Sequence, residues 1–295
     1  MNNQFFITNT YGFSGFENWH SKSLSGMYKY CSMHNIKLNV MNENDFRIKN
    51  LISKSNNYLC PLLRKAVRFY SAVESGADYC FFVDMDTLIL DMSKNISDYI
   101  SEENQYINCF NISSEDLIKQ KNTGQLRPYP SMKLEIHKLF KSEYPETICR
   151  CDTGYSCFSR QFCLNFLDFL SDNNLDMTSS TGINNLVEIT KHGQALENTC
   201  NTAWVHDEHL IELFLSTNAN YKNYNIIGTC NNSVKMCSSH YHVNGNSNRS
   251  VFPELLIDNV EKSHYLYLMA KQDCVLHHLL MSKEHVKRYF SMFEK

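Results

Sequence analysis

Residues 79–90 read Tyr79-Cys-Phe-Phe-Val-Asp84-Met-Asp86-Thr-Leu-Ile-Leu90, an apolar run broken by two carboxylates one residue apart. A run so rich in aromatic and β-branched residues is typical of a buried strand in a parallel sheet. Ligands of open α/β sheets bind at the carboxyl ends of such strands. Two acidic side chains there would be costly if dry and unpaired, so a cation is their simplest partner. The stretch therefore indicates a divalent metal that carries a phosphorylated ligand, and the alternative is a helix N-cap or a solvated turn.

The segments before this strand alternate between strand and helix patterns. We expect strands over 4–10 and 36–40, and helices over 16–31 and 61–73. Apolar residues recur near a 3.6-residue period in both helices, and Pro61 suits the start of the second. Strand, helix, strand, helix, strand is the pattern of a parallel sheet with helices on its faces. The predicted fold class is therefore α/β, with a Rossmann-like, mostly parallel central sheet flanked by helices.

The pattern is looser in the second part of the chain. The expected elements are a strand over 105–110, irregular structure around one short helix over 113–150, a strand over 155–159, a helix over 162–170, loops over 171–203, a helix over 210–215, strands over 224–227 and 239–243, and mostly helix over 252–295. No repeat or low-complexity linker divides the chain. We expect one domain over 1–250, with functional halves 1–110 and 111–250, and a helical C-terminal extension over 251–295 packed on it.

The composition is that of an ordinary globular protein. Of the 295 residues, 43% are hydrophobic and 20% are charged, and the formal net charge is −3. The scattered charges give no basic footprint for nucleic acid. No apolar segment approaches the roughly 20 residues that span a bilayer, and no signal peptide is visible, so a cytoplasmic protein is expected. The 12 cysteines include no Cys-x-x-Cys pair, which favours reduced thiols.

A second candidate segment carries histidines. His240 and His242 would share one strand face, and Gly245 would let a backbone N–H approach a phosphate. Imidazole together with carboxylate and phosphate oxygens suits Mn²⁺ better than Ca²⁺. The alternative is two half-buried histidines in an edge strand, and the sequence does not decide which of the two would bind a metal.

Further charged groups stand at helix starts. Asp207 and Glu208 precede an apolar helix. Such an acidic pair either caps the helix with a favourable dipole interaction, or supplies a carboxylate that faces the reacting centre or binds substrate hydroxyl groups. Arg64, Lys65 and Arg68 lie on the helix before the acidic strand. One of them would reach a diphosphate, or all three are surface charges with solvated heads.

In order, these segments resemble a GT-A-fold nucleotide-sugar glycosyltransferase, most like the glycogenin-like enzymes of glycosyltransferase family 8. The matching segments, within residues 4–248, are Ile7-Thr-Asn-Thr-Tyr11, Leu63-Arg-Lys65, Phe82-Val-Asp84-Met-Asp86, Asp152-Thr-Gly154, Asp207-Glu208 and His242-x-x-Gly245. Asp152 and Glu208 replace the usual Asn and Gln, and Asn246-Ser-Asn248-Arg249 stands where Lys-Pro-Trp often follows. These departures leave the subfamily and the donor sugar open.

The resemblance implies transfer of a sugar from a nucleoside diphosphate sugar, with a UDP-sugar as donor and a glycan or other hydroxyl compound as acceptor. It implies Mn²⁺ (or Mg²⁺) held by Asp84, Asp86 and His242, with Asp86 favoured as the direct ligand over Asp84. The implied nucleotide contacts are Thr8, Asn9, Tyr11, Arg64, Lys65, Asp84 and Gly245. The implied sugar-site and catalytic residues, around an oxocarbenium-like transition state, are Asp152, Asp207 and Glu208. Retention and inversion both stay open.

Two other functions compete with this one. A phosphatase of the haloacid-dehalogenase type also places Asp-x-Asp after an apolar strand, but normally on the first core strand and with a later Gly-Asp-x-x-x-Asp motif, which is absent here. A non-catalytic member of the same fold would bind nucleotide or glycan only. Such a protein would not need the set Asp84, Asp86 and His242, so the enzyme is favoured.

Overall fold

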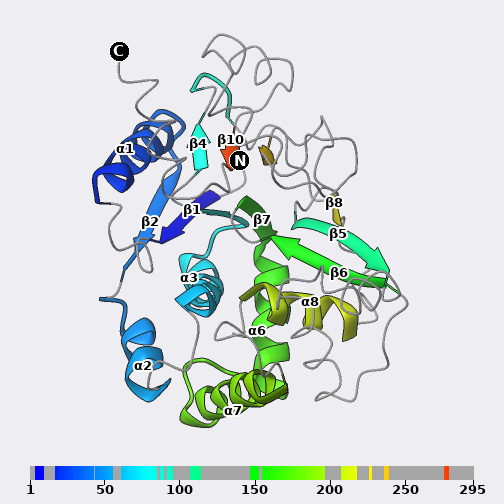
Figure 1. Ribbon diagram of the computed structural model, residues 1–295. Helices are drawn as coiled ribbons and strands as arrows, with labels where there is room; N and C mark the ends of the chain where they lie inside the picture. The colour runs from blue at the N-terminus through cyan, green and yellow to red at the C-terminus, as the bar shows by residue number, and fades with distance from the viewer. Residues whose placement is uncertain are drawn as a thin grey trace, which may run out of the picture.

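The computed structural model describes residues 4–9, 17–42, 44–55, 61–84, 87–89, 92–95, 107–113, 147–152, 155–196, 207–217, 226–227, 236–238 and 276–278. Within these residues the strands form three sheets (Figure 1). The largest has the order β2-β1-β3-β7. No helix among the described residues is long and apolar enough to cross a membrane.

The four-stranded sheet is parallel except at one end. Strands β1 (Gln4–Asn9), β2 (Lys37–Met41) and β3 (Tyr79–Val83) run parallel, and β7 (Tyr155–Ser159) pairs with β3 in the antiparallel direction. All five residues of β3 are buried, as expected for a strand with helices on both faces. The predicted mostly parallel sheet is confirmed, whereas the more specific GT-A assignment stays a prediction.

Helices cover both faces of this sheet (Figure 1). On one face, α1 (Glu17–Met33) buries Tyr30 against the side of β3 that carries Phe81. On the other face lie α3 (Val67–Ser75), which follows the 3₁₀ helix η1 (Pro61–Ala66), and α6 (Arg160–Asp172). The alternation of side chains along β3 thus divides its residues between two hydrophobic clusters.

Aromatic packing fixes α3 on the sheet. The ring centroid of Phe69 lies 4.7 Å from that of Phe82 on β3 and 4.5 Å from that of Phe166 on α6. The helix ends at Gly76, whose φ of +70° is a left-handed conformation that glycine adopts without strain. Since Phe69 is adjacent to Arg68, this packing also fixes the backbone of the charged residues at the start of α3.

Two helices in the described residues differ from expectation. The prediction of loops over 171–203 is wrong for α7 (Ser180–Leu196), in which Ile183, Leu186, Val187 and Thr190 form a buried face at helical spacing. The polar residues between them hid that period. The helix α2 (Phe46–Ser55) was not predicted, and it packs against α7 in the lower part of Figure 1. Helix α8 (Asp207–Thr217) contains the helix expected over 210–215 and begins three residues earlier.

Two smaller sheets complete the described part of the chain. Strand β5 (Ile107–Ser113) pairs antiparallel with β6 (Thr147–Asp152) and parallel with β8 (Ile226–Ile227). Strand β6 begins inside a region expected to be irregular. Strand β10 (Leu276–His278) joins β4 (Thr87–Ile89) to β9 (Met236–Ser238) and lies within the segment 252–295 that was expected to be mostly helical. The strand predicted over 239–243 lies outside the described residues.

Candidate functional site

A buried carboxylate stands directly after β3. The Asp84 side chain is 5% exposed, and its two oxygens accept hydrogen bonds from two different cations. Lys65 Nζ donates to Oδ2, and Arg68 Nη1 donates to Oδ1 at 3.1 Å. The carboxyl end of the strand therefore carries a carboxylate that is paired with two cations, a pairing that the sequence did not predict.

Arg68 is the centre of this arrangement. Its side chain is 0% exposed, and its Nη2 lies 3.5 Å from Oδ2 of Asp207, a residue 139 positions later in the chain. Its Nε donates to the backbone oxygen of Lys65 at 3.1 Å, and its guanidinium carbon lies 4.8 Å from the centroid of the Phe82 ring. We call Lys65, Arg68, Asp84 and Asp207 the inner cluster. It holds two positive and two negative charges and is formally neutral.

The local structure explains why the two cations point the same way. Lys65 is the second-last residue of the 3₁₀ helix η1, and Arg68 lies in the first turn of α3. Residues three apart in such a segment lie nearly one above the other, so both side chains can reach Asp84. The fourth member, Asp207, is the first residue of α8, which packs against η1. A carboxylate is favourable at that helix start because of the helix dipole.

Charges in the inner cluster stabilise one another. Burial by itself would lower the pKa of Lys65, but the Asp84 and Asp207 carboxylates outweigh burial and raise the pKa above its usual value. The ammonium group therefore stays protonated at neutral pH despite being buried. Lys65 is thus a fixed positive charge within the cluster.

The inner cluster bears on the predicted metal site. The cation that the sequence analysis expected beside Asp84 is supplied by Lys65 and Arg68, so Asp84 needs no metal for charge balance. Asp86 and His242 lie outside the described residues, as do His240, Gly245 and Tyr11. In the part of the chain that is described, no three His, Cys, Asp or Glu side chains are grouped to hold a metal ion.

The other predicted site residues fall on several elements. Thr8 and Asn9 end β1, which runs parallel to β3, so their backbone reaches the sheet edge where Asp84 stands. Arg64 lies in η1, and Asp152 is the last residue of β6, the strand against which α8 packs. Glu208 follows Asp207 in the first turn of α8 and is partly exposed, whereas Asp207 is buried.

Some buried polar residues were missed from sequence. Arg68 was considered only as one of three interchangeable cations, although its spacing of three from Lys65 could have marked both for one site. On α8, His209 and Glu212 are buried as well, 2% and 1% exposed. Their own spacing of three within an otherwise apolar helix is the signal that could have found them. The start of α8 is therefore more polar inside the protein than its sequence suggested.

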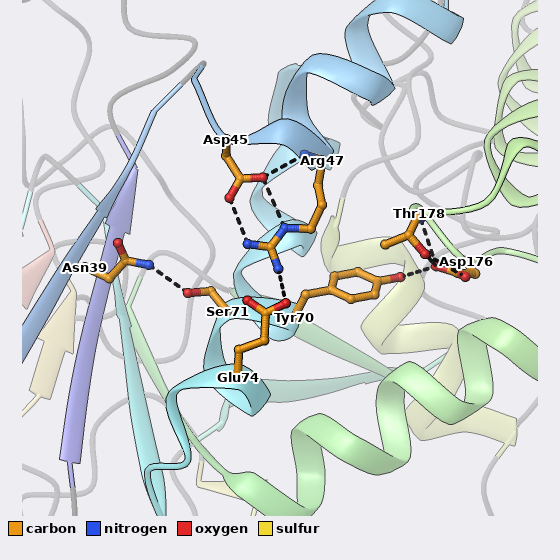
Figure 2. A network of polar contacts seen from close by, with 8 residues as sticks. All are labelled: Asn39, Asp45, Arg47, Tyr70, Ser71, Glu74, Asp176 and Thr178. Carbon is orange, nitrogen blue, oxygen red and sulfur yellow. Dashed lines mark hydrogen bonds and ion pairs between the residues drawn. The ribbon is translucent and has the colours of Figure 1, made fainter.

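A second polar network contacts α3 through Tyr70 and Glu74 (Figure 2). Arg47 donates to Asp45 and, at 2.8 Å, to Glu74 on α3. Tyr70 Oη donates to Asp176 Oδ1 at 2.7 Å and accepts from the backbone N–H of Met177 at 3.1 Å. We call the set Asp45, Arg47, Tyr70, Glu74, Asp176 and Thr178 the outer network; nearby, Asn39 of β2 donates to Ser71. The outer network links α3 to α2 and to the turn before α7.

The four cysteines whose side chains the structure describes take no part in either network. Cys31, Cys80, Cys157 and Cys163 are free thiols and are buried. Burial raises the pKa of Cys31 to about 12 and that of Cys80 to about 12, although a contact with Ser75 opposes the shift at Cys80. These thiols are therefore packing groups and not nucleophiles.

Comparisons with known proteins address the class of chemistry. No curated protein sequence matches the chain. A solved structure described as "crystal structure of a glycosyltransferase involved in the glycosylation of the major capsid of PBCV-1" aligns over 98% of both chains, with 11% identity and a TM-score of 0.40. That likeness is too slight to carry an argument.

The family comparison is more informative. Residues 8–138 match the model of the galactosyl transferase GMA12/MNN10 family. The matched range includes Lys65, Arg68 and Asp84, and it ends before Asp207. The glycogenin-like assignment of the sequence analysis is not confirmed by this match. What the match supports is that the chain is a glycosyltransferase.

Proposed function

We propose that this protein is a metal-dependent glycosyltransferase that moves a sugar from a UDP-sugar to a hydroxyl group of a glycan or glycoconjugate. The observation that carries the proposal is the match of residues 8–138 to a galactosyl transferase family, since this range contains the Asp84 end of β3. The family description makes UDP-galactose the first donor to test. The inner cluster supports the proposal because it places cations and carboxylates together at the sheet edge where nucleotides bind.

The donor's nucleotide part would bind at the carboxyl ends of β1 and β3. Thr8, Asn9 and Tyr11 would contact the base and ribose, and Arg64 would support the phosphates with the backbone of Gly245. Lys65, which is paired with Asp84, would contribute a fixed positive charge to this nucleotide end of the site. Mn²⁺ or Mg²⁺ held by Asp86 and His242 would supply positive charge to the departing diphosphate.

The sugar would lie towards the start of α8. Asp152 would bind its hydroxyl groups from the end of β6, the strand that packs against α8. Asp207 is buried and paired with Arg68, so we assign it an indirect, structural role in the site. Glu208 is partly exposed, and it is therefore the carboxylate of this pair that we assign to the positive charge of an oxocarbenium-like transition state.

A donor screen tests the proposed transfer. Purified protein is incubated with Mn²⁺ and UDP-galactose, UDP-glucose, UDP-N-acetylglucosamine or UDP-xylose, with and without simple sugar acceptors, and released UDP is measured. We expect release from at least one donor, and loss of release when the metal is chelated. No release from any donor would overturn the proposal. Release of phosphate from p-nitrophenyl phosphate with Mg²⁺, without any UDP release, would support the phosphatase instead.

A binding experiment separates the two carboxylates of residues 84 and 86. Calorimetric titration with UDP and Mn²⁺ is carried out on the wild type, Asp86→Ala and Asp84→Asn, with circular dichroism as the check on folding. We expect Asp86→Ala to abolish the Mn²⁺-dependent part of the UDP affinity. Asp84→Asn should retain Mn²⁺ dependence, because its pairing with Lys65 and Arg68 makes it a neighbour of the metal and not its main ligand. Unchanged affinity in Asp86→Ala would remove the metal assignment.

A further inference from the structure

Arg68 joins two parts of the molecule that share no strand pairing among the described residues. Asp84 follows β3 in the β2-β1-β3-β7 sheet, whereas Asp207 begins α8, which packs against β6 of the β6-β5-β8 sheet. One guanidinium group touches both carboxylates, at 3.1 Å and 3.5 Å. In the proposed function, Asp84 belongs to the nucleotide end of the site and Asp207 to the sugar end.

We propose that Arg68 is a positioning residue that sets the separation between these two ends, a role that rests on the proposed function. Arg68 acts through Asp84 and Asp207 and does not touch the donor, because its side chain is 0% exposed. The sugar–phosphate bond must lie at one fixed position between the diphosphate contacts and the carboxylates of α8. Arg68 keeps the distance between Asp84 and Asp207 constant.

The shape of the guanidinium suits this role. It presents donors in a rigid planar fork, so two carboxylates bound to different nitrogens have a fixed geometry relative to each other. The fork is itself held from two further directions, by the hydrogen bond from Nε to the Lys65 backbone oxygen and by the Phe82 ring beneath it. A lysine at this position would present a point charge with rotatable donors and would not fix the two carboxylates relative to each other.

Stability alone is a weak reason for this arrangement. Replacing a buried set of paired charges by apolar side chains of similar volume is often neutral or stabilising, because desolvation offsets the Coulomb attraction. What fixed charges do provide is a defined geometry in a region without backbone pairing. The inner cluster lies at such a place, between the end of β3 and the start of α8.

The test compares Arg68→Lys with Arg47→Lys. Arg47 is a matched control because it also binds two carboxylates, Asp45 and Glu74, but lies in the outer network. For both variants, kcat and KM are measured with the donor found in the screen, and UDP–Mn²⁺ affinity is measured by calorimetry. UDP lacks the sugar, so its binding does not depend on the separation between the two ends.

We expect Arg68→Lys to lower kcat about 100-fold, the effect of misplacing a reacting group by about 1 Å, while UDP–Mn²⁺ affinity stays within about threefold of the wild type. Arg47→Lys should leave both quantities near the wild-type values. A merely structural role for Arg68 would lower kcat and the number of UDP sites in parallel, in proportion to the folded fraction, and that result would overturn the proposal. So would a wild-type kcat in Arg68→Lys.

A second measurement does not depend on sugar transfer. The urea midpoints of Arg68→Met, Asp207→Asn and the double variant are compared with the wild type. If Arg68 holds Asp207, the midpoint shift of the double variant is smaller than the sum of the two single shifts; additive shifts would overturn the proposed link, whatever the activity. If the wild type releases no UDP from any donor, the proposed function and the positioning role fall together, even where coupling is found. If the wild type is active and Arg68→Lys has the same kcat, only the positioning role is overturned.

Discussion

The inner cluster and the outer network both hold α3, but they differ in how far their charged side chains are shielded from solvent. In the inner cluster all four charged side chains are nearly or fully out of contact with solvent, and positive and negative charges are equal in number. In the outer network Arg47 is 6% exposed, but its partner Glu74 is 63% exposed, and neutral hydroxyl groups share the work. The outer network can lose one contact to water. The inner cluster cannot, because a charge left behind there stays buried and uncompensated.

The largest expected effect comes from removing the central arginine. Arg68→Met removes the guanidinium group that contacts both Asp84 and Asp207, and it should lower the free energy of unfolding by about 3–5 kcal/mol. Arg47→Met removes the corresponding arginine of the outer network and should lower it by about 1–2 kcal/mol, because Glu74 and Asp45 can be solvated. Urea unfolding followed by circular dichroism gives both values. Equal losses would end the distinction between the two regions.

The next effect disturbs the outer network through the backbone. A Cβ on Gly182 would stand 2.0 Å from the backbone oxygen of Asp176, so Gly182→Ala must displace either α7 or Asp176. We expect a loss of about 1–3 kcal/mol in the free energy of unfolding. Gly26→Ala is the matched control, since a Cβ there would meet only Met92 at 3.9 Å. That substitution in α1 should stabilise by about 0.5–1 kcal/mol. A neutral Gly182→Ala would mean that the turn before α7 can move freely.

A smaller effect is expected from a single hydroxyl group. Tyr70→Phe removes the donor to Asp176 and the acceptor for the N–H of Met177, and should lower the free energy of unfolding by about 1 kcal/mol. The double variant with Asp176→Asn should lose less than the sum of the single variants, because the two side chains share one hydrogen bond. Chemical denaturation of the three variants measures this coupling. Strict additivity would show that α3 is not held through Tyr70.

The smallest effect concerns the pH dependence of stability. Burial by itself would raise the pKa values of Asp45 and Asp176, but hydrogen bonds from Arg47 and from Thr178 and Tyr70 outweigh burial and lower them. Their contribution is therefore complete above the unfolded-state pKa of about 3.9, and is lost as the pH falls through the lower folded-state values. Asp176→Asn should flatten the loss of thermal stability between about pH 4 and pH 2. Identical acid-side curves for variant and wild type would contradict this account.

Prediction from sequence succeeded where one period dominated. The strand before Asp84 is an unbroken apolar run, and α1 and α6 show a clear 3.6-residue period, so these elements were found. Helix α7 was missed because Ser, Thr, Gly and Asn dominate its first six residues, 180–185. The packing of that face against the rest of the protein outweighs their low helix propensity. Tertiary burial of this kind is not visible in a local window.

The candidate site was predictable as a set of residue types but not as a set of partners. Asp84, Lys65 and Asp207 were all named from sequence, and the structure brings them together. That Asp84 needed positive charge was also clear. Which positive charge would meet it depends on the register between η1, α3 and β3, and that register follows from the packing of Phe69 and not from any motif. Asp86 and His242 stay predictions.

The antiparallel pairing of β3 with β7 has a consequence for biosynthesis. The buried strand β3 finds one of its neighbours only when Tyr155–Ser159 has left the ribosome, well after β1 and β2 are available. Until then one edge of β3 and the aromatic residues above it are open to other chains. A fragment that stops at residue 110 would keep that open edge permanently. We therefore expect such truncations to aggregate during expression, and β7 with α6 to be the part whose arrival commits the nascent chain to its fold.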